Sequence, residues 1–247
     1  MPPRPPLPLE SLRVVLVAPR NPLNIGAVAR VMSNLGVLRL RVVNPYEVAF
    51  REARSAVGAA EVLKDAEEFG DVADAVADCT LVVGTTAIGN RQPVHPLRNL
   101  VPAAAIIRKR LATDTVGVLF GSEKWGLSNE ALSHCHWILH IPTRKEHRSM
   151  NVGHAVAVCL YEIVRTGLAL ADKPAAKSSK ARAEIVERIT MTLLDVLQTS
   201  GYVNARSEAS AGEKLRRLVR RLDLDAADAE VLLGMFHKIR WKLHSGR

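Results

Sequence analysis

Short apolar runs alternate with longer amphipathic segments through the first two thirds of the chain. Five runs have the length and β-branched content of buried strands, and each ends at a small or turn-favouring residue. The predicted strands are residues 14–18, 38–43, 80–84, 116–120 and 137–141. Apolar residues recur at helical spacing between these runs. The predicted helices are residues 24–32, 51–63, 71–77, 102–111 and one that starts near residue 151. This alternation predicts an α/β fold with a mostly parallel sheet.

Several predicted helices begin or end at a residue that suits a helix terminus. Asn24 can cap the free backbone N–H groups of the first helix, and Gly36 can end that helix. Ser128 is placed to cap a short helix between the fourth and fifth strands.

The pattern changes near residue 172. Residues 172–180 are polar and of low complexity, which is typical of a linker. Three amphipathic segments follow, at residues 182–199, 211–222 and 226–243. We therefore predict a disordered tail (1–11), an α/β domain (12–171), a linker (172–180) and a small all-helical domain (181–247).

The middle amphipathic segment is strongly basic. Its apolar residues are predicted to share one face, which consists of Leu215, Leu218, Val219 and Leu222. The basic side chains predicted around the rest of that helix are Lys214, Arg216, Arg217, Arg220 and Arg221. They are either a solvated helix face or a binding patch for RNA.

Charge narrows the class of partner. The 247 residues carry a formal net charge of +9 and are 48% hydrophobic, so the chain can bury a core and favours an anionic partner. Residues 173–221 alone hold 11 basic and 5 acidic side chains, a net charge of +6. Nucleic acid is the first candidate partner and a membrane surface the second.

Other features exclude or disfavour whole classes of protein. No apolar run reaches membrane-spanning length, and the proline-rich start lacks the apolar core of a signal peptide. Three cysteines without paired spacing disfavour a disulfide scaffold and favour a reducing cytoplasm. Residues 134–136 (His-Cys-His) have no second ligand pair at zinc spacing, so we predict no metal site. Dinucleotide and P-loop motifs are also missing, because Leu127 and Ser128 stand where a P-loop needs Lys and Ser or Thr.

Three short motifs are predicted to meet in space. Residues 120–127 read Phe-Gly-Ser-Glu-Lys-Trp-Gly-Leu after one strand, and Ile141-Pro142 ends another. Residues 148–151 read Arg-Ser-Met-Asn at the start of an apolar helix. Two strand ends and a helix start would converge where an open α/β sheet usually holds its ligand.

These motifs resemble those of the SpoU/TrmH branch of the SPOUT RNA methyltransferases, with Met150 in place of the usual Leu. The first family motif corresponds to residues 24–30, Asn-Ile-Gly-Ala-Val-Ala-Arg. Gly201-Tyr202 and the Lys-Leu-Arg-Arg-Leu sequence at 214–218 narrow the resemblance to TrmJ-type enzymes, which methylate ribose 2′-oxygens at position 32 of the tRNA anticodon loop.

The resemblance implies a fold, a reaction and partners. It implies a SPOUT fold with a C-terminal trefoil knot, S-adenosylmethionine as methyl donor, tRNA as substrate, no metal, and a homodimer. The helix after Asn151 also favours pairing, because it is apolar on nearly every face. Two alternatives stay open: a ribosomal RNA methyltransferase, and a non-catalytic RNA-binding protein with the same fold. The sequence does not distinguish cytidine from uridine as the target.

The resemblance also assigns candidate site residues. The implied catalytic residues are Arg30, Ser149 and Asn151. The implied cofactor-binding residues are Thr85, Thr86, Ala87, Gly121, Ile141, Arg148, Ser149 and Met150. The implied RNA-binding residues are Arg20, Asn24, Arg30, Lys214, Arg216, Arg217, Arg220 and Arg221.

The chemistry of arginine limits what Arg30 can do. Because its side chain stays protonated, it is better suited to grip a phosphate and stabilise a developing alkoxide than to act as a base. Its alternative role is that of an ordinary surface arginine. Glu123 is expected to anchor its loop or to orient a partner; the alternative is an ordinary carboxylate at a helix N-terminus.

Overall fold

The computed structural model describes residues 7–55, 61–86, 95–144, 146–165, 180–204 and 208–245. Its seven strands are β1 (Leu12–Val17), β2 (Arg39–Val43), β3 (Glu67–Phe69), β4 (Leu81–Thr86), β5 (Leu97–Asn99), β6 (Val116–Phe120) and β7 (Trp137–His140). They form one sheet in the order β3-β2-β1-β6-β4-β7-β5, and every neighbouring pair is parallel. The predicted α/β class and parallel sheet are confirmed.

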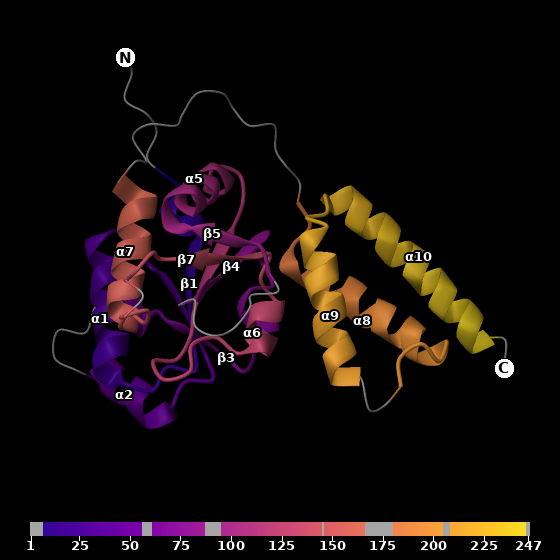
Figure 1. The fold of residues 1–247 in the computed structure, drawn as a ribbon, viewed down its shortest axis with the longest axis horizontal. Helices are drawn as coiled ribbons and strands as arrows, with labels where there is room; N and C mark the ends of the chain where they lie inside the picture. The colour runs from indigo at the N-terminus through magenta and orange to yellow at the C-terminus, as the bar shows by residue number, and fades with distance from the viewer. Residues whose placement is uncertain are drawn as a thin grey trace, which may run out of the picture.

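Helices cover both faces of the sheet (Figure 1). The larger apolar cluster joins one face to α1 (Pro22–Asn34), α2 (Glu47–Ser55), α3 (Glu61–Lys64), α5 (Leu100–Leu111) and α7 (Val152–Arg165). The smaller cluster joins the other face to α4 (Val72–Ala75) and α6 (Asn129–Ser133). This two-sided cover explains why the central strands read as nearly continuous apolar runs.

Side chains on one central strand alternate between the two cores. Val116, Val118 and Phe120 of β6 belong to the larger cluster, whereas Leu119 belongs to the smaller one. Gly117 also faces the smaller core, where an added Cβ would come 3.2 Å from the Cys79 sulfur. The alternation is the period of two that a strand imposes.

The five predicted strands are confirmed within one or two residues, but β3 and β5 are not predicted by the pattern. Each of these two strands has three residues and lies at an edge of the sheet. The residues of β5 are all exposed, so no apolar alternation marks it in the sequence.

The first helix begins earlier than predicted. Asn21, not Asn24, is its N-cap, and the Asn21 side chain accepts a hydrogen bond from the Leu23 N–H at 2.9 Å. Pro22 then occupies the first turn, where its missing N–H costs nothing. The predicted end is confirmed, since Gly36 follows the C-cap with φ +71°. Ser128 caps α6 as predicted, accepting from the Ala131 N–H.

Two predicted segments are corrected near the chain start. The helix predicted for residues 51–63 begins earlier, at Glu47; its described parts are α2 and α3, and residues 56–60 lie outside the description. Residues 1–11 are not all a tail, because Leu9–Ser11 form a short 3-10 helix and Leu9 packs against the larger core.

Three further helices follow residue 180. They are α8 (Ala183–Thr199), α9 (Glu208–Arg221) and α10 (Ala226–Ser245), and they lie beside the α/β part with α9 next to α6 (Figure 1). Their own apolar cluster is small and includes Ile189, Val219 and Leu233. Of the predicted linker, only Lys180 is described; its ammonium contacts the Asp223 carbonyl at 2.7 Å and the Asp225 carboxylate at 3.1 Å.

The orientation of α9 differs from the prediction. Leu218 and Leu222 are 44% and 54% exposed, so they do not face a core. Arg220 is instead 1% exposed. Val219 is buried against α8 as predicted, but α9 also meets α8 through the Arg216–Glu187 pair and meets α6 through Arg216 and Ser133. The amphipathic pattern alone does not reveal these polar contacts.

Within the described part of the chain, no helix is both long enough and apolar enough to cross a membrane.

Candidate active site

A cleft of about 480 Å³ lies at the carboxyl ends of β4, β6 and β7, which are neighbours in the sheet. Parallel strands direct their carboxyl ends to one edge, which is where ligands bind in open α/β sheets. Three segments meet in this cleft as predicted: the loop after β6, the segment after β7 and the start of α7. Its size lies within the range of small-molecule sites.

The loop after β6 is closed tightly on itself. The Gly126 N–H donates to the Ser122 carbonyl at 2.8 Å, and Gly126 has φ +67°. A Cβ on Gly121 would lie 2.0 Å from the carbonyl carbon of Gly126, which no side chain can tolerate. Glycine at position 121 is therefore a steric requirement of the loop, which presents backbone to the cleft.

Glu123 ties this loop to the start of α1. Its carboxylate accepts from the backbone N–H groups of Arg20 and Asn21, each at 3.3 Å, and from the Asn24 side-chain amide at 3.0 Å. Glu123 thus anchors its loop and also lies as a carboxylate at a helix N-terminus, two of the roles expected of it. With three donors already bound, it is a structural acceptor and a poor candidate for a base.

The same polar chain continues into α7. Asn151 donates from its amide nitrogen to the Asn24 side-chain oxygen at 2.8 Å. Its own oxygen accepts from the N–H groups of Gly153 and His154, so Asn151 also caps α7. One N–H of the Asn151 amide remains for a further partner. The helix start, the β6 loop and α1 are thereby held in one arrangement.

Seven of the eight predicted cofactor residues line this one cleft. They are Thr85, Thr86, Gly121, Ile141, Arg148, Ser149 and Met150. Ala87 lies outside the described residues. Thr85 uses its hydroxyl to donate to the Leu119 carbonyl of β6 at 2.8 Å, which fixes the end of β4 against its neighbour.

Arg30 is not brought to the cleft. It is exposed on α1 and is absent from the lining of the cleft in the single chain, which corrects the expectation that it faces the crevice. It lies beside Val31, which borders a shallow groove between α1, α5 and α7. Asn24 does reach the site region through Glu123 and Asn151, while Arg20 contributes its backbone N–H and keeps an exposed side chain.

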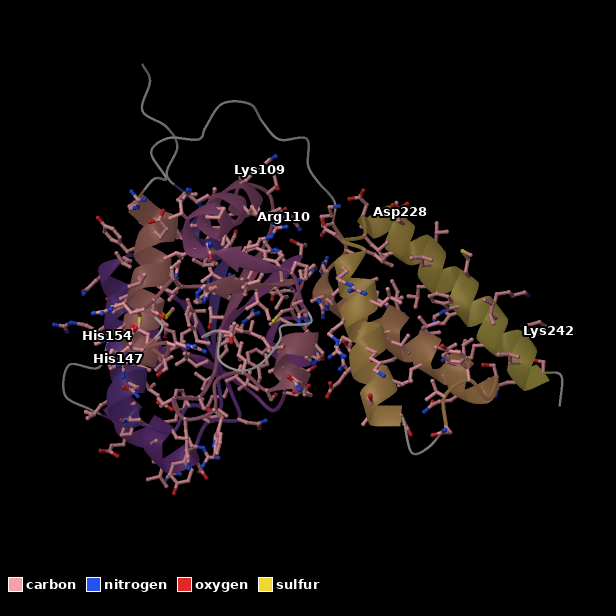
Figure 2. All side chains as sticks on the ribbon, in the orientation of Figure 1. Lys109, Arg110, His147, His154, Asp228 and Lys242 are labelled. Atoms are coloured by element: carbon pink, nitrogen blue, oxygen red, sulfur yellow. The ribbon has the colours of Figure 1, made fainter. Side chains whose placement is uncertain are left out.

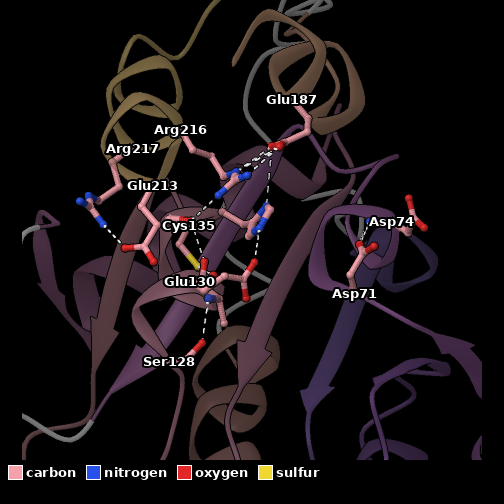
Figure 3. Close-up of polar contacts among 12 residues, drawn as sticks. Asp71, Asp74, Ser128, Glu130, Cys135, Glu187, Glu213, Arg216 and Arg217 are labelled. Carbon is pink, nitrogen blue, oxygen red and sulfur yellow. Dashed lines mark hydrogen bonds and ion pairs between the residues drawn. The ribbon is translucent and has the colours of Figure 1, made fainter. Parts of the chain in front are cut away.

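The predicted basic patch on α9 is divided in two. Lys214 and Arg221 are exposed, as expected of an RNA-binding surface. Arg216 bonds the Glu187 carboxylate at 3.0 Å and the Ser133 hydroxyl at 3.1 Å, and Arg217 pairs with Glu213 at 3.4 Å (Figure 3). Arg220 is buried, so the prediction of four equivalent solvent-facing arginines is wrong. Packing of α9 against α6 turns these side chains inward.

The side chains of residues 134–136 (His-Cys-His) point in three different directions. His134 contacts Glu130 at 3.0 Å, Cys135 is buried in the smaller core, and His136 accepts from the Val82 N–H at 3.1 Å. The part of the chain that the structure describes holds no group of three His, Cys, Asp or Glu arranged for a metal ion.

Among the loop residues that line the cleft and to which the sequence analysis assigned no role, four are polar or aromatic. They are Ser122, Lys124, Trp125 and Thr143. Trp125 is 68% exposed at the cleft, with the Lys124 ammonium 4.8 Å from its ring centre. The signal available in the sequence is the tryptophan between two glycines, because an aromatic residue in a loop at a strand end favours a contact with a ligand.

Comparison with known proteins gives a consistent picture. Residues 11–161 match the model of the SpoU rRNA Methylase family. A relative from Sodalis glossinidius, named tRNA (cytidine/uridine-2′-O-)-methyltransferase TrmJ, is 32% identical over 238 residues, covering 94% of this chain and 92% of the relative. A protein of the same name from Photorhabdus laumondii is 31% identical, covering 94% and 98%.

A solved structure shows the same arrangement over nearly the whole chain. The crystal structure of TrmJ from Z. mobilis superposes with a TM-score of 0.79 at 29% identity, covering 92% of this chain and 98% of that one. The likeness therefore includes residues beyond the α/β part.

Proposed function

Because the chain belongs to the SpoU rRNA methylase family, we propose that it methylates the ribose 2′-hydroxyl of a tRNA nucleotide, using S-adenosylmethionine. The observation that carries this proposal is the cleft at the ends of β4, β6 and β7, where the described cofactor candidates meet. The full-length similarity to proteins named as tRNA methyltransferases supplies the substrate class.

The cleft suits the proposed cofactor. Its wall contains apolar side chains for an adenine ring, from Leu139, Ile141, Met150 and Val152, and hydroxyl groups from Thr86, Thr143 and Ser149. The closed loop at Gly121 presents backbone, which a side chain there would obstruct. When bound, S-adenosylmethionine supplies an activated methyl group, so the protein needs no metal to activate the donor.

The task of the protein is then to position the ribose and to stabilise the charge that develops on its 2′-oxygen. Ser149 and the remaining N–H of Asn151 lie at the start of α7 and can donate hydrogen bonds there. Arg30 is proposed to grip the neighbouring phosphate and to stabilise the alkoxide. Glu123 and Asn24 hold Asn151 in place through a chain of hydrogen bonds.

We further propose nucleotide 32 of the anticodon loop as the target, by analogy with the TrmJ-type branch. Methylation of ribosomal RNA is the weaker candidate, because the three helices beyond residue 180 are part of the likeness to the Z. mobilis enzyme. Three buried free thiols and a tRNA substrate support a cytoplasmic location.

The knot and the domain limits are also proposals. Strand β7 lies between β4 and β5, although β4 and β5 are consecutive strands in the chain. Strand β7 comes later in the chain, yet it lies between two strands that an earlier connection joins. This order supports the trefoil knot that the family implies. The separate apolar cluster of α8, α9 and α10 supports a helical domain over residues 181–247, after an α/β domain (12–171) and a linker (172–180).

A homodimer is proposed from the surface of α1, α5 and α7. Val101 and Tyr161 are 59% and 60% exposed, and Val158 is 37% exposed, beside a shallow apolar groove of about 470 Å³. An apolar face of this kind is typical of a protein interface. Arg30 lies next to this face, so the pairing would decide what its side chain contacts.

A methyl-transfer assay with defined tRNA tests the proposed function. Purified protein should transfer label from S-adenosylmethionine to an unmodified tRNA transcript. The same transcript with a single 2′-deoxynucleotide at position 32 should accept none. Equal labelling of both transcripts would contradict the proposed position, and no labelling of tRNA together with labelling of ribosomal RNA would contradict the substrate class.

A further inference from the structure

A second cleft lies on another side of the α/β part, where α9 meets the edge of the sheet. Its volume is about 380 Å³, and it is bordered by the end of α5, the segment around β5 and β7, and the end of α9. Arg110 points toward this side of the molecule (Figure 2). No residue that lines it also lines the proposed methyl-transfer cleft.

The lining is strongly basic. Four arginines contribute to it, Arg98, Arg110, Arg220 and Arg221, against one carboxylate, Asp223. Arg110 is satisfied, because it pairs with Asp114 at 2.9 Å and lies 3.5 Å from Asp223. Asp223 is in turn shared with the Lys180 ammonium at 3.4 Å. The lining therefore carries excess positive charge.

Arg220 is the most unusual member of this group. It is 1% exposed, and within the described residues its Nε and Nη1 atoms have no hydrogen-bond partner. Its Nη2 donates a long hydrogen bond of 3.5 Å to the Ala183 carbonyl. Burial lowers its pKa to about 10, so the side chain is still charged at neutral pH. A buried guanidinium with unused donors is costly unless an anion compensates it.

Within the described residues, no carboxylate forms a hydrogen bond or an ion pair with Arg220. The charge of the partly buried Glu187 acts on Arg220, but the Glu187 oxygens accept hydrogen bonds from Arg216, at 3.0 and 3.1 Å. Arg98 and Arg221 are exposed, and neither makes an ion pair with any residue in the described ranges. Arg98 instead lies 5.5 Å from the ring centre of Trp137.

A second unused polar atom lies beside the same cleft. His95 is 7% exposed, precedes Pro96 of the cleft lining, and is close enough to Arg221 and Arg217 for their charges to act on it. Its Nε2 atom has no hydrogen-bond partner among the described residues. Burial, with the two arginines adding to it, lowers the pKa of His95 to about 4, so the neutral ring can still donate one N–H.

We propose that this cleft binds a phosphate group, with Arg98 and Arg221 as its direct ligands and Arg220 as the buried charge behind them. Arginine matches phosphate oxygens with paired N–H donors, and the low polarity around Leu81, Ile106 and Trp137 strengthens the attraction. The phosphate comes either from an RNA backbone or from a free phosphate or nucleotide. The idea that an RNA backbone supplies the phosphate rests on the proposed function. The existence of the phosphate site does not.

Thermal unfolding of the full-length protein with inorganic phosphate tests the site without tRNA or S-adenosylmethionine. Phosphate is titrated at constant ionic strength against chloride. The Arg98→Ala/Arg221→Ala double variant removes two exposed ligands, so it is expected to fold. Its matched control is Arg39→Ala/Arg188→Ala, which removes two exposed arginines that do not line the cleft.

The wild type and the control are expected to gain a saturable rise in unfolding temperature. The double variant should need about 10- to 100-fold more phosphate for the same rise. An equal response in all three proteins, or no response beyond that to chloride, would overturn the proposal. Because this readout involves no methyl transfer, its failure is distinct from failure of the proposed function.

Binding of unmodified tRNA then distinguishes the two sources of phosphate. If the RNA backbone supplies it, the double variant should lower the slope of log affinity against log salt by about 0.7 to 0.9, the value for one phosphate contact. The control should leave the slope unchanged. A normal salt slope together with a lost response to inorganic phosphate would support the site and assign it to a free phosphate or nucleotide.

Discussion

At the scale of single residues, the amide of Asn24 has the central position in the candidate active site. It joins Glu123 of the β6 loop to Asn151 at the start of α7. The sequence motif identified all three residues, but it assigned Asn24 to a helix cap and to RNA binding. The sequence around Asn24 indicates that its side chain has a functional role. It cannot indicate that the partner is Asn151, because that residue is 127 positions away and the fold brings the two together.

Arg30→Ala should reduce methyl transfer by about 100- to 1,000-fold or more, because a cation at the developing alkoxide acts mainly in the transition state. The affinity for S-adenosylmethionine should stay nearly unchanged, since Arg30 does not line the cofactor cleft. Single-turnover rates and calorimetry measure the two quantities. Arg39→Ala is the control, as an exposed arginine on β2. A normal rate of methyl transfer by Arg30→Ala would contradict a catalytic role for Arg30 and would leave it as an ordinary surface residue.

Asp78 is expected to contribute to the acid sensitivity of the fold. Burial opposes its ionisation, but hydrogen bonding to Arg41 and the charges of Arg41 and Arg13 outweigh that effect and hold its pKa below the ordinary value. A carboxyl whose pKa is depressed on folding stabilises the protein above its unfolded pKa, near 4, and loses this contribution as pH falls through the folded pKa.

Asp78→Asn should therefore lower the free energy of unfolding at pH 7 by about 1 kcal/mol, a modest value because Asp78 is 39% exposed and water screens its pairs. The difference from wild type should shrink as pH falls below about 4. Urea unfolding at a series of pH values measures it. A difference that stays constant down to pH 2 would show that the ion pairs are not its cause.

At the scale of elements, the sequence predicts the buried strands and most helices well because a buried element needs apolar side chains at a fixed period. It does not predict β5, whose three exposed residues are held by pairing with β7. It also misplaces the faces of α9. The amphipathic rule assumes an apolar contact, whereas α9 meets α6 through Arg216 and Ser133.

Glu187 is expected to hold α9 in that position. It lies 3.0 Å from Arg216 and 3.8 Å from His134, and all three side chains are less than one fifth exposed (Figure 3). Glu187→Gln keeps the shape but leaves the Arg216 charge unpaired, which should destabilise the α9 contact by about 1–3 kcal/mol. Hydrogen exchange in α9 measures it. Glu230→Gln, an exposed carboxylate on α10, is the control, and equal exchange in both variants would contradict the role of Glu187.

At the scale of the whole molecule, the exposed face of α1, α5 and α7 predicts a homodimer. Tyr161→Lys should convert the protein to a monomer, because a charge inside an apolar interface is not compensated. Sedimentation velocity at micromolar protein concentration measures whether each variant is a monomer or a dimer. Tyr202→Lys changes another exposed tyrosine, which follows α8, and should leave the dimer intact. A wild-type protein that sediments as a monomer would contradict the proposed pairing.

The central claim is that this protein places a methyl group on a tRNA ribose. Mapping 2′-O-methyl groups on tRNA from cells with and without the gene tests it most directly. Loss of one methyl group in the anticodon loop, at position 32, is the predicted result, restored by the wild-type gene and not by the gene for Arg30→Ala. An unchanged tRNA map, with a methyl group missing from ribosomal RNA instead, would contradict the account.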